Sequence, residues 1–388
     1  MPNQSLAPST PTSEPVDLVI VGAGIVGLGH AVEAVSRGLT VTVLDRDERA
    51  VGASIRNFGH VGTTVQDGQG LEYALLTRER WLALADKAGF DVEQVGTVVA
   101  ARTDAELGVL EEFAADRGPE QVRLLTGAEV RAAVPPLTSE VIGGAHLPLD
   151  LRVDPRAAVP TLAAWLADEG VTFGWDTHVG GIDSRTDHDA DGVVVHTGRG
   201  PISAARAVLA VGHDLDRLFP EIAEEAGVRR CLLRMLEVAP PADARIAPAV
   251  LTGTSLLRYA GFARTRAAAQ VRAEIEERTP ELLDAAVNLM LTQRPDGSLV
   301  LGDTHRYERT HGPFDDDGLE ALLLREGARL LGGSLTVRRR WRGVYADSPQ
   351  TDFLIAAPRP GVRAVAVTSG IGMTTGLGLA PTVIDQLF

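Results

Sequence analysis

Three glycines near the start of the chain have the spacing of a phosphate-binding turn. Gly22, Gly24 and Gly27 form G-x-G-x-x-G directly after the apolar run DLVIV. This spacing allows a tight turn, close approach of a pyrophosphate and packing of a helix, whose N-terminus attracts the phosphates. Asp45 ends the next apolar run, LTVTVLD, where a carboxylate accepts ribose hydroxyls. A dinucleotide site is predicted, with NAD or FAD favoured over NADP because Asp45 would repel a 2′-phosphate.

A second group of polar residues follows this unit closely. The stretch GASIRNFGHV, residues 52–61, places Arg56, Asn57 and His60 among glycines. Arginine suits a carboxylate or a phosphonate because its planar fork contacts two oxygens at once. Lys87 is the only lysine in the sequence, so lysine is removed from any catalytic role. Arg56 is therefore the first candidate for binding an anion, and an internal ion pair is the simpler alternative.

The pattern also indicates which elements must position these residues. Residues 16–47 are typical of strand, helix and strand, and residues 71–90 look helical with one apolar side. Asp154 and Pro155 form a helix start, an N-cap followed by proline in the first turn, and the helix is expected to end near Gly170. The further βα repeats of NAD dehydrogenases do not follow.

The end of the chain repeats the order of strand, glycine-rich loop and helix. Residues 364–387 read AVAVTSGIGMTTGLGLAPTVIDQL, with Gly370 and Gly372 in the loop. A second helix N-terminus directed into the same cleft would stabilise an anionic group of the cofactor. An ordinary glycine-rich turn is the alternative.

Composition limits the class of protein. A chain of 388 residues suits about two domains, and its 45% apolar residues contain no run of the ~20 that a membrane span needs. The net charge of −15 argues against nucleic acid as a partner. The single cysteine, Cys231, excludes an internal disulfide and a cysteine-based metal cluster, and we expect a buried, inert thiol and no metal. Residues 1–15 are expected to be a disordered tail without signal-peptide features, and the protein to be cytoplasmic.

Together these motifs resemble the D-amino-acid oxidase family of FAD-dependent oxidoreductases, which includes glycine and sarcosine oxidases. The resemblance spans Val16 to Phe388 in the family's order of motifs. RNFG after the second strand and GDTHRY late in the chain are similar to a branch associated with catabolism of aminophosphonates and their N-methyl derivatives. The resemblance implies an α/β fold: a Rossmann-like FAD domain from residues 16–90, 150–220 and 340–388, and a substrate domain with a mixed or antiparallel sheet from residues 91–149 and 221–339.

The resemblance also implies which residues contact FAD. Gly343 stands where sarcosine oxidases carry the flavin-linked cysteine, so FAD should be bound non-covalently. A surface arginine is an equal alternative for Arg46. The residues expected to bind the cofactor are Gly22, Gly24, Ile25, Val26, Gly27, Asp45, Arg46, Gly52, Ala53, Ser54, Val179, Ala210, Gly212, Gly370, Gly372, Met373 and Thr374.

A further set of residues is expected to contact the substrate. Thr374 replaces the terminal-loop lysine with which sarcosine oxidases hold the substrate carboxylate. The expected catalytic residues are Arg56, His305 and Tyr345, and the expected substrate-binding residues are Arg56, Asn57, His60, Arg258, Arg306 and Thr374. Inert histidine, core packing and surface placement are the respective alternatives for His305, Tyr345 and the two later arginines.

The predicted reaction is the oxidation of a small amine that carries an anionic group. A neutral amine passes hydride to flavin N5, and the resulting imine hydrolyses to an aldehyde or keto acid plus an amine. O₂ or another acceptor reoxidises the flavin, and no nucleic acid or membrane is involved. A sarcosine, glycine or D-amino-acid oxidase, an NAD-dependent dehydrogenase and a non-catalytic flavin-binding protein stay open as alternatives.

Overall fold

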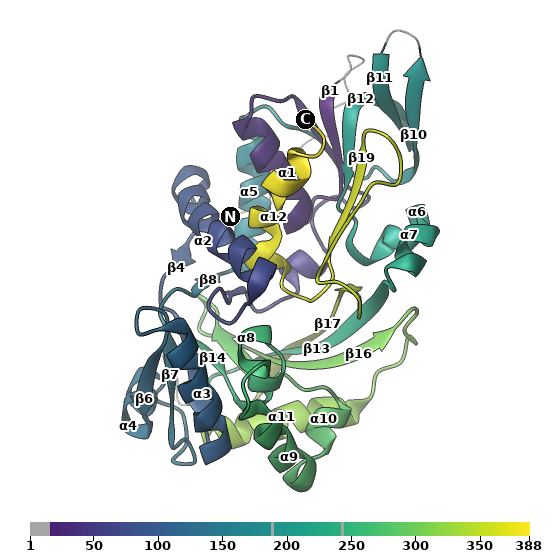
Figure 1. Cartoon of the computed structure of the whole chain (residues 1–388). Helices are drawn as coiled ribbons and strands as arrows, with labels where there is room; N and C mark the ends of the chain where they lie inside the picture. Colours follow the sequence, from purple (N-terminus) through teal and green to yellow (C-terminus); the bar gives the residue numbers. More distant parts are fainter. Residues whose placement is uncertain (1–15, 188–189, 242–243) are drawn as a thin grey trace.

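A mixed sheet, parallel at its centre and antiparallel at its margins, forms the upper half of the molecule in Figure 1. The computed structural model describes residues 16–187, 190–241 and 244–388, so the predicted tail 1–15 lies outside the described residues. The strands of this sheet run in the order β10-β11-β12-β1-β2-β9, with β19 paired to β12 and β18 to β19. They are β1 (Val16–Val21), β2 (Val41–Leu44), β9 (Thr172–Gly174), β10 (Val179–Asp187), β11 (Ala190–Thr197), β12 (Gly200–Leu209), β18 (Phe353–Ala356) and β19 (Val362–Val367).

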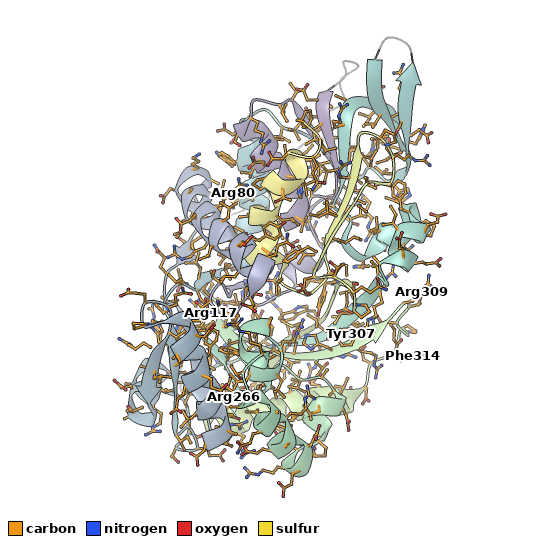
Figure 2. The ribbon with its side chains drawn as sticks, viewed as in Figure 1. Arg80, Arg117, Arg266, Tyr307, Arg309 and Phe314 are labelled. Atoms are coloured by element: carbon orange, nitrogen blue, oxygen red, sulfur yellow. The ribbon has the colours of Figure 1, made fainter. Side chains whose placement is uncertain are left out.

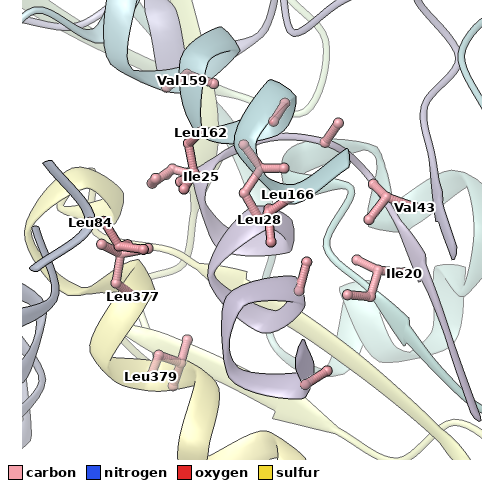
Figure 3. Close-up of a cluster of buried hydrophobic side chains, with 14 of the residues drawn as sticks. Ile20, Ile25, Leu28, Val43, Leu84, Val159, Leu162, Leu166, Leu377 and Leu379 are labelled. Atoms are coloured by element: carbon pink, nitrogen blue, oxygen red, sulfur yellow. The ribbon is translucent and has the colours of Figure 1, made fainter. Parts of the chain in front are cut away.

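Four helices cover one face of this sheet. They are α1 (Ile25–Ser36), α2 (Gly68–Ala88), α5 (Pro155–Asp168) and α12 (Gly372–Ile384), and α12 packs against both α1 and α2. Their leucines meet the strand residues in a buried core. Figure 3 shows Leu28 and Leu166 on the side of Ile20 and Val43, whereas Leu377 lies on the other side of α1, near Leu84. Each such side chain contributes about 1.5–3 kcal/mol of burial, which holds the glycine-rich ends of α1 and α12 in place.

Local sequence explains where α5 begins. The Asp154 side chain accepts a hydrogen bond from the backbone N–H of Arg156 at 3.1 Å, and Pro155 occupies the first turn. This is the predicted N-cap with proline behind it, and it satisfies a backbone N–H group that no helix carbonyl can reach.

A second, mostly antiparallel sheet forms the lower half. Its strands run in the order β17-β13-β16-β15-β14-β5-β7-β6, and only the pair of β14 and β5 is parallel among those described. They are β5 (Thr97–Ala101), β6 (Arg123–Thr126), β7 (Gly143–Leu147), β13 (Arg229–Val238), β14 (Ala249–Leu251), β15 (Met290–Gln293), β16 (Leu299–Glu308) and β17 (Val337–Asp347). The helices around it are α3 (Asp104–Arg117), α4 (Gly127–Ala133), α8 (Ala260–Ala263), α9 (Ala268–Arg278), α10 (Glu281–Asp284) and α11 (Asp317–Leu331).

Short elements join the two sheets. The stretch 52–61 ends in a small sheet of β3 (His60–Val61), β8 (Leu151–Val153) and β4 (Val92–Glu93). The remaining elements are the 3₁₀ turns η1 (Ala53–Ile55), η2 (Gly212–Asp214) and η4 (Gly253–Leu257) and the helices α6 (Leu215–Leu218) and α7 (Pro220–Glu225).

Strand register brings residues from distant parts of the chain to one face. Leu233 in β13 lies opposite His305 in β16 on one side and opposite Gly343 in β17 on the other. Two residues away, Cys231 lies opposite Tyr345 in the same way. Because residues at i and i+2 of a strand share a face, these side chains all point toward the first sheet or its connections.

The predicted α/β class with a second, mainly antiparallel sheet is confirmed. The domain segments themselves stay a prediction, and residue 340, a predicted boundary, falls inside β17, which pairs with β13 along nearly all its length. Among the described residues, none of the helices is both long and apolar enough to cross a membrane.

Replacing Gly27 by alanine is expected to destabilise the protein. The added Cβ would lie 1.9 Å from the carbonyl oxygen of Gly22, so α1 would have to move away from β1. Alanine is the better helix former, yet overpacking of this kind costs about 1–3 kcal/mol. Urea unfolding measures the change. Gly198→Ala, where an added Cβ meets nothing within 4 Å, is the control, and equal unfolding free energies in the two variants would contradict this packing.

Candidate functional site

A long cavity of about 570 Å³ runs between the two sheets. It is lined by most of the residues that the sequence singled out, from Gly22 and Asp45 at one end to Arg258 and His305 at the other. Of the predicted residues, Gly27 and Arg306 do not line it. Gly27 packs α1 on β1 instead, and Arg306 is exposed because it neighbours His305 in a strand whose successive residues face opposite ways.

The first end of the cavity is a backbone cradle. Gly22 has a φ of +106°, and a Cβ there would lie 2.4 Å from the carbonyl oxygen of Ala210, so both the conformation and the space require glycine. The Ser54 hydroxyl accepts a hydrogen bond from the N–H of Ile25 at 2.9 Å, which ties the 52–61 stretch to the start of α1. This bond uses one N–H group at the helix N-terminus, and we expect the following N–H groups of the first turn to face a phosphate group.

Asp45 is held where the sequence predicted a ribose contact. Its carboxylate accepts the N–H of Ala23 at 2.7 Å and that of Asp47 at 3.0 Å, and burial raises the pKa of this carboxyl. A carboxylate has about four acceptor positions, so two remain for hydroxyl groups. Arg46 next to it donates to Asp214 at 2.6 Å. The positive charge of Arg46, which a 2′-phosphate would need as its partner, is therefore already compensated.

The N-terminus of α12 faces the same cavity from the other side. Gly370, Gly372, Met373 and Thr374 line it, and the Thr374 hydroxyl accepts the N–H of Gly62 at 3.2 Å. Because this helix has 13 residues and its first turn contains no acidic side chain, its dipole is available to an anionic group in the cavity.

The polar residues of the 52–61 stretch, Arg56, Asn57 and His60, form hydrogen bonds with different parts of the chain. Arg56 donates to the carbonyl of Arg342 at 3.3 Å and lines the cavity. Asn57 uses its amide inside the loop, since it donates to the carbonyls of Ala53 and Ser54 and accepts the N–H of Gly59. It therefore fixes the shape of the loop. His60 is bound at Nε2 by Thr97, 2.8 Å away, with the buried Asp150 at 3.4 Å.

Arg258 is more centrally placed than the sequence suggested. Its Nη2 group donates to the Tyr345 hydroxyl at 3.0 Å and to the carbonyl of Ser369 at 2.9 Å, both neutral oxygens. Within the described part of the chain, the guanidinium forms no ion pair, although it is partly buried and lines the cavity. A guanidinium has five N–H donors, so most of its binding capacity is left for another group.

His305 and Tyr345 lie together as the register requires. The Nδ1 atom of His305 donates to the carbonyl of Ala286 at 2.8 Å, which leaves Nε2 as an acceptor. Burial, helped by the charge of Arg258, lowers the pKa of His305 to about 3, so the ring is neutral. Burial also raises the pKa of Tyr345 well above its usual value, so its hydroxyl keeps its proton.

Cys231 on β13 and Tyr307 on β16 are neighbours of these residues. Burial raises the pKa of the Cys231 thiol to about 12, in agreement with the predicted inert cysteine. Figure 2 shows Tyr307 on β16 at the boundary between the halves, whereas Arg309 and Phe314 lie at the periphery of the molecule.

Sequence reasoning missed the buried carboxyl group of Asp303. It lies two residues before His305 in the quoted motif GDTHRY and lines the same cavity. The signal available in the sequence was its position two residues before His305, because residues two apart in a strand share a face. Tyr259, Asn288 and Ile371 also line the cavity and were not predicted.

Comparison with known proteins identifies the family. A family model described as "DAO: FAD dependent oxidoreductase" matches residues 17–386. The chain belongs to this family. FAD is therefore its cofactor, as predicted, and the described residues fit it: a glycine cradle, an acid for the ribose and a second helix N-terminus.

Several known proteins are similar to this member of the DAO family. One of the subunits of opine oxidase from Rhizobium meliloti is 28% identical over 226 residues, which cover 53% of this chain and only 59% of that relative. Glycine oxidase from Bacillus cereus has a TM-score of 0.76 at 19% identity, over 96% of this chain and 94% of its own. L-proline dehydrogenase from P. horikoshii has a TM-score of 0.77 at 20% identity, over 96% and 93%. The two structures show that the fold is shared.

Asp45→Ala is expected to weaken FAD binding at least about tenfold. Hydrogen bonds to a charged group contribute about 1.5–3 kcal/mol, and 1.4 kcal/mol is a factor of ten. Fluorescence titration of the apoprotein with FAD measures the affinity, and a melting curve checks the fold. Asp47→Ala, which removes an adjacent carboxylate that is 43% exposed, is the matched control. Equal FAD affinities in the two variants would rule out a ribose contact by Asp45.

Proposed function

We propose that this protein oxidises a small secondary amine that carries an anionic group, with N-methylaminophosphonates as the preferred class. The observation that carries the proposal is the pair of arginines at the substrate end of the cavity. Arg56 and Arg258 line it, and neither forms an ion pair within the described part of the chain. A charge held away from water needs a partner, and a bound anion supplies it.

The other two cavity arginines behave differently. Arg46 and Arg217 both pair with Asp214, at 2.6 and 2.9 Å. The arginines at the cofactor end of the cavity therefore have their charge compensated, whereas those at the substrate end leave an excess of positive charge. Two guanidiniums at that end fit a phosphonate, or two carboxylates, better than a single carboxylate.

The two arginines flank one strand of the second sheet. The backbone carbonyl of Arg56 lies beside Gly343, and the guanidinium of Arg258 is bound to Tyr345. Gly343 and Tyr345 share a face of β17 and both line the cavity, so Arg56 and Arg258 lie at neighbouring positions along one wall, and we expect one small anion to be within reach of both. Gly343 also leaves no side chain for a covalent flavin link, which supports non-covalent FAD.

Bound FAD would supply the acceptor for hydride from the carbon next to the amine nitrogen, and would pass the electrons to O₂ or another acceptor. The chain's own residues orient the substrate for that transfer. Arg258 and Arg56 hold the anion, and the Nε2 atom of neutral His305 accepts an N–H hydrogen bond. The walls around Leu233 and Tyr345 exclude water.

The relatives support a secondary amine. L-proline dehydrogenase is named for a secondary amine with a carboxylate, and the opine oxidase of Rhizobium meliloti for an opine. The motifs RNFG and GDTHRY support the aminophosphonate class. Glycine oxidase is the named neighbour that would favour a primary amine instead.

An anaerobic flavin-reduction screen tests the substrate class. N-methylaminophosphonates, sarcosine, glycine and D-amino acids are mixed with the holoenzyme, and bleaching of the flavin absorbance is followed. We expect the aminophosphonate to reduce the flavin fastest because two guanidiniums face its doubly charged group. Fastest reduction by glycine or a D-amino acid would overturn the aminophosphonate assignment, and no reduction by any amine would overturn the proposed reaction.

Arg258→Met and Arg56→Met test the anion contacts. Each variant is expected to raise the Kd of the substrate by about tenfold or more, since a charge-assisted hydrogen bond contributes about 1.5–3 kcal/mol. The limiting reduction rate should change less, because the anion is bound equally in the ground and transition states. Arg306→Met is the matched control, since Arg306 is exposed and lies outside the cavity. A Kd in the two cavity variants equal to that of Arg306→Met would exclude these contacts.

A further inference from the structure

Asp303 is a buried carboxyl group in the cavity whose hydrogen-bonding capacity is not fully used. Its residue is 4% exposed, and its Oδ1 atom has no hydrogen-bond partner among the described residues. Leaving an acceptor of this kind unpaired is costly, and such groups are rare in native proteins without a function or a ligand. A donor from a bound molecule would satisfy it.

The backbone fixes where this carboxyl group points. The N–H of Asp303 donates to the carbonyl of Asn288, and the carbonyl of Asp303 accepts the N–H of Asn288 in return, both at 2.8 Å. The pairing of β13 with β16 shifts between Arg234 and Met235, so Asp303 has no partner in β13. Such a bulge re-aims one side chain, and here the side chain lines the cavity.

The charged and titratable groups around Asp303 come from several elements. Arg258 and Tyr259 directly precede α8, Cys231 lies on β13, and His305 and Tyr307 lie on β16. Burial raises the pKa of Asp303 to about 7, against the opposing effect of Arg258. The three other acidic groups, two tyrosines and a thiol, stay protonated, since burial raises their pKa values to about 12.

His305 is the other basic group within reach, but it is unsuited to hold a proton. Its Nε2 atom lies 3.8 Å from Oδ2 of Asp303, and burial lowers its pKa to about 3. Burial raises the pKa of Asp303 to about 7, so its carboxylate can take up a proton near neutral pH. Of these two neighbours, the carboxylate is therefore the better base.

We propose that Asp303 receives the substrate's ammonium group beside the anion held by Arg258 and removes one of its protons. The step rests on the proposed function. An N–H bond of the ammonium breaks, its electron pair stays on nitrogen, and the proton forms an O–H bond with the Asp303 carboxylate. The products are a neutral amine, which can release hydride from the adjacent carbon, and a neutral carboxyl group.

With this assignment, the site recognises a substrate that carries both an anionic group and a cationic amine. Arg258 selects the anion and Asp303 selects the cationic amine, while neutral His305 accepts a remaining N–H. A hydroxy compound of the same shape offers no proton that a carboxylate of this pKa can remove. The site is thereby specific for amines over alcohols.

The test compares Asp303→Asn with the wild-type holoenzyme in anaerobic stopped-flow experiments with the amine that reduces the flavin best. The wild-type second-order rate constant should rise up to about pH 7 and then level off until the amine itself loses its proton. At pH 7 the variant should be about a hundredfold slower, within the usual range for general base catalysis. Its rate should keep rising tenfold per pH unit up to the pKa of the free amine, because only neutral amine reacts.

A second measurement needs no turnover. Methylphosphonate carries the anion without the amine, and its binding is followed by the change in flavin absorbance above pH 7. The Asp303→Asn variant should bind it at least about fivefold more tightly, the effect that removing one like charge about 4 Å away would have even at the dielectric constant of water. Asp303→Glu keeps the carboxylate and should restore the level region of the pH profile, which a purely structural loss would not allow.

Glu106→Gln is the matched control for removal of a buried carboxyl group. Glu106 in α3 is 5% exposed, burial raises its pKa, and it lies outside the cavity. This variant should keep the wild-type profile and methylphosphonate affinity. If amines reduce the flavin but Asp303→Asn also keeps both, the role of Asp303 is overturned while the proposed function stands. If no amine reduces the flavin, both the role of Asp303 and the proposed function are overturned.

Discussion

The positive charge of Arg258 is the constraint around which the substrate end of the cavity is arranged. Its guanidinium is held by two neutral oxygens, the Tyr345 hydroxyl and the Ser369 carbonyl, and no carboxylate of the described chain pairs with it. The same charge helps keep His305 neutral and opposes the rise in the pKa of Asp303. Burial is the main cause of the shifted pKa values of these neighbours, the charge of Arg258 modifies them, and its guanidinium leaves a place for an anion.

The cofactor end follows a different principle, in which backbone groups replace side-chain charges. The N-termini of α1 and α12 face the same cavity, and the first turn of neither helix carries an acidic side chain. Their approach is fixed by buried packing of α12 on α1 and α2, which begins at the cavity wall and continues along the helices. Charged residues at this end, Arg46 and Asp214, compensate each other, so we expect binding of FAD to depend on N–H groups, helix dipoles and Asp45.

Much of the cofactor half was predictable because its signals are local. Gly22, Gly27 and Asp45 act through turn geometry, close packing and strand ends, which depend on spacing within about 25 residues. The N-cap at Asp154 is local as well, and it formed as expected. The residues of the substrate half stay predictions, and their hydrogen bonds could not be derived from the sequence. Asn57 lines the cavity but binds its own loop through its amide, whereas the guanidinium of Arg258 contacts two neutral oxygens and forms no ion pair within the described chain.

The sequence by itself determined the family, the cofactor and the class of fold, since these depend on motifs whose residues act through neighbouring backbone. Only the tertiary structure decided which polar side chains share the cavity and which are already bonded. Asp303 and Tyr345 lie on strands β16 and β17, which meet on either side of β13, and Arg258 joins them from the segment before α8 through its hydrogen bond to Tyr345. Burial and hydrogen-bond partners, which set charge and pKa, exist only after that pairing has formed. For that reason, His305 was visible as a histidine, but its neutrality was not.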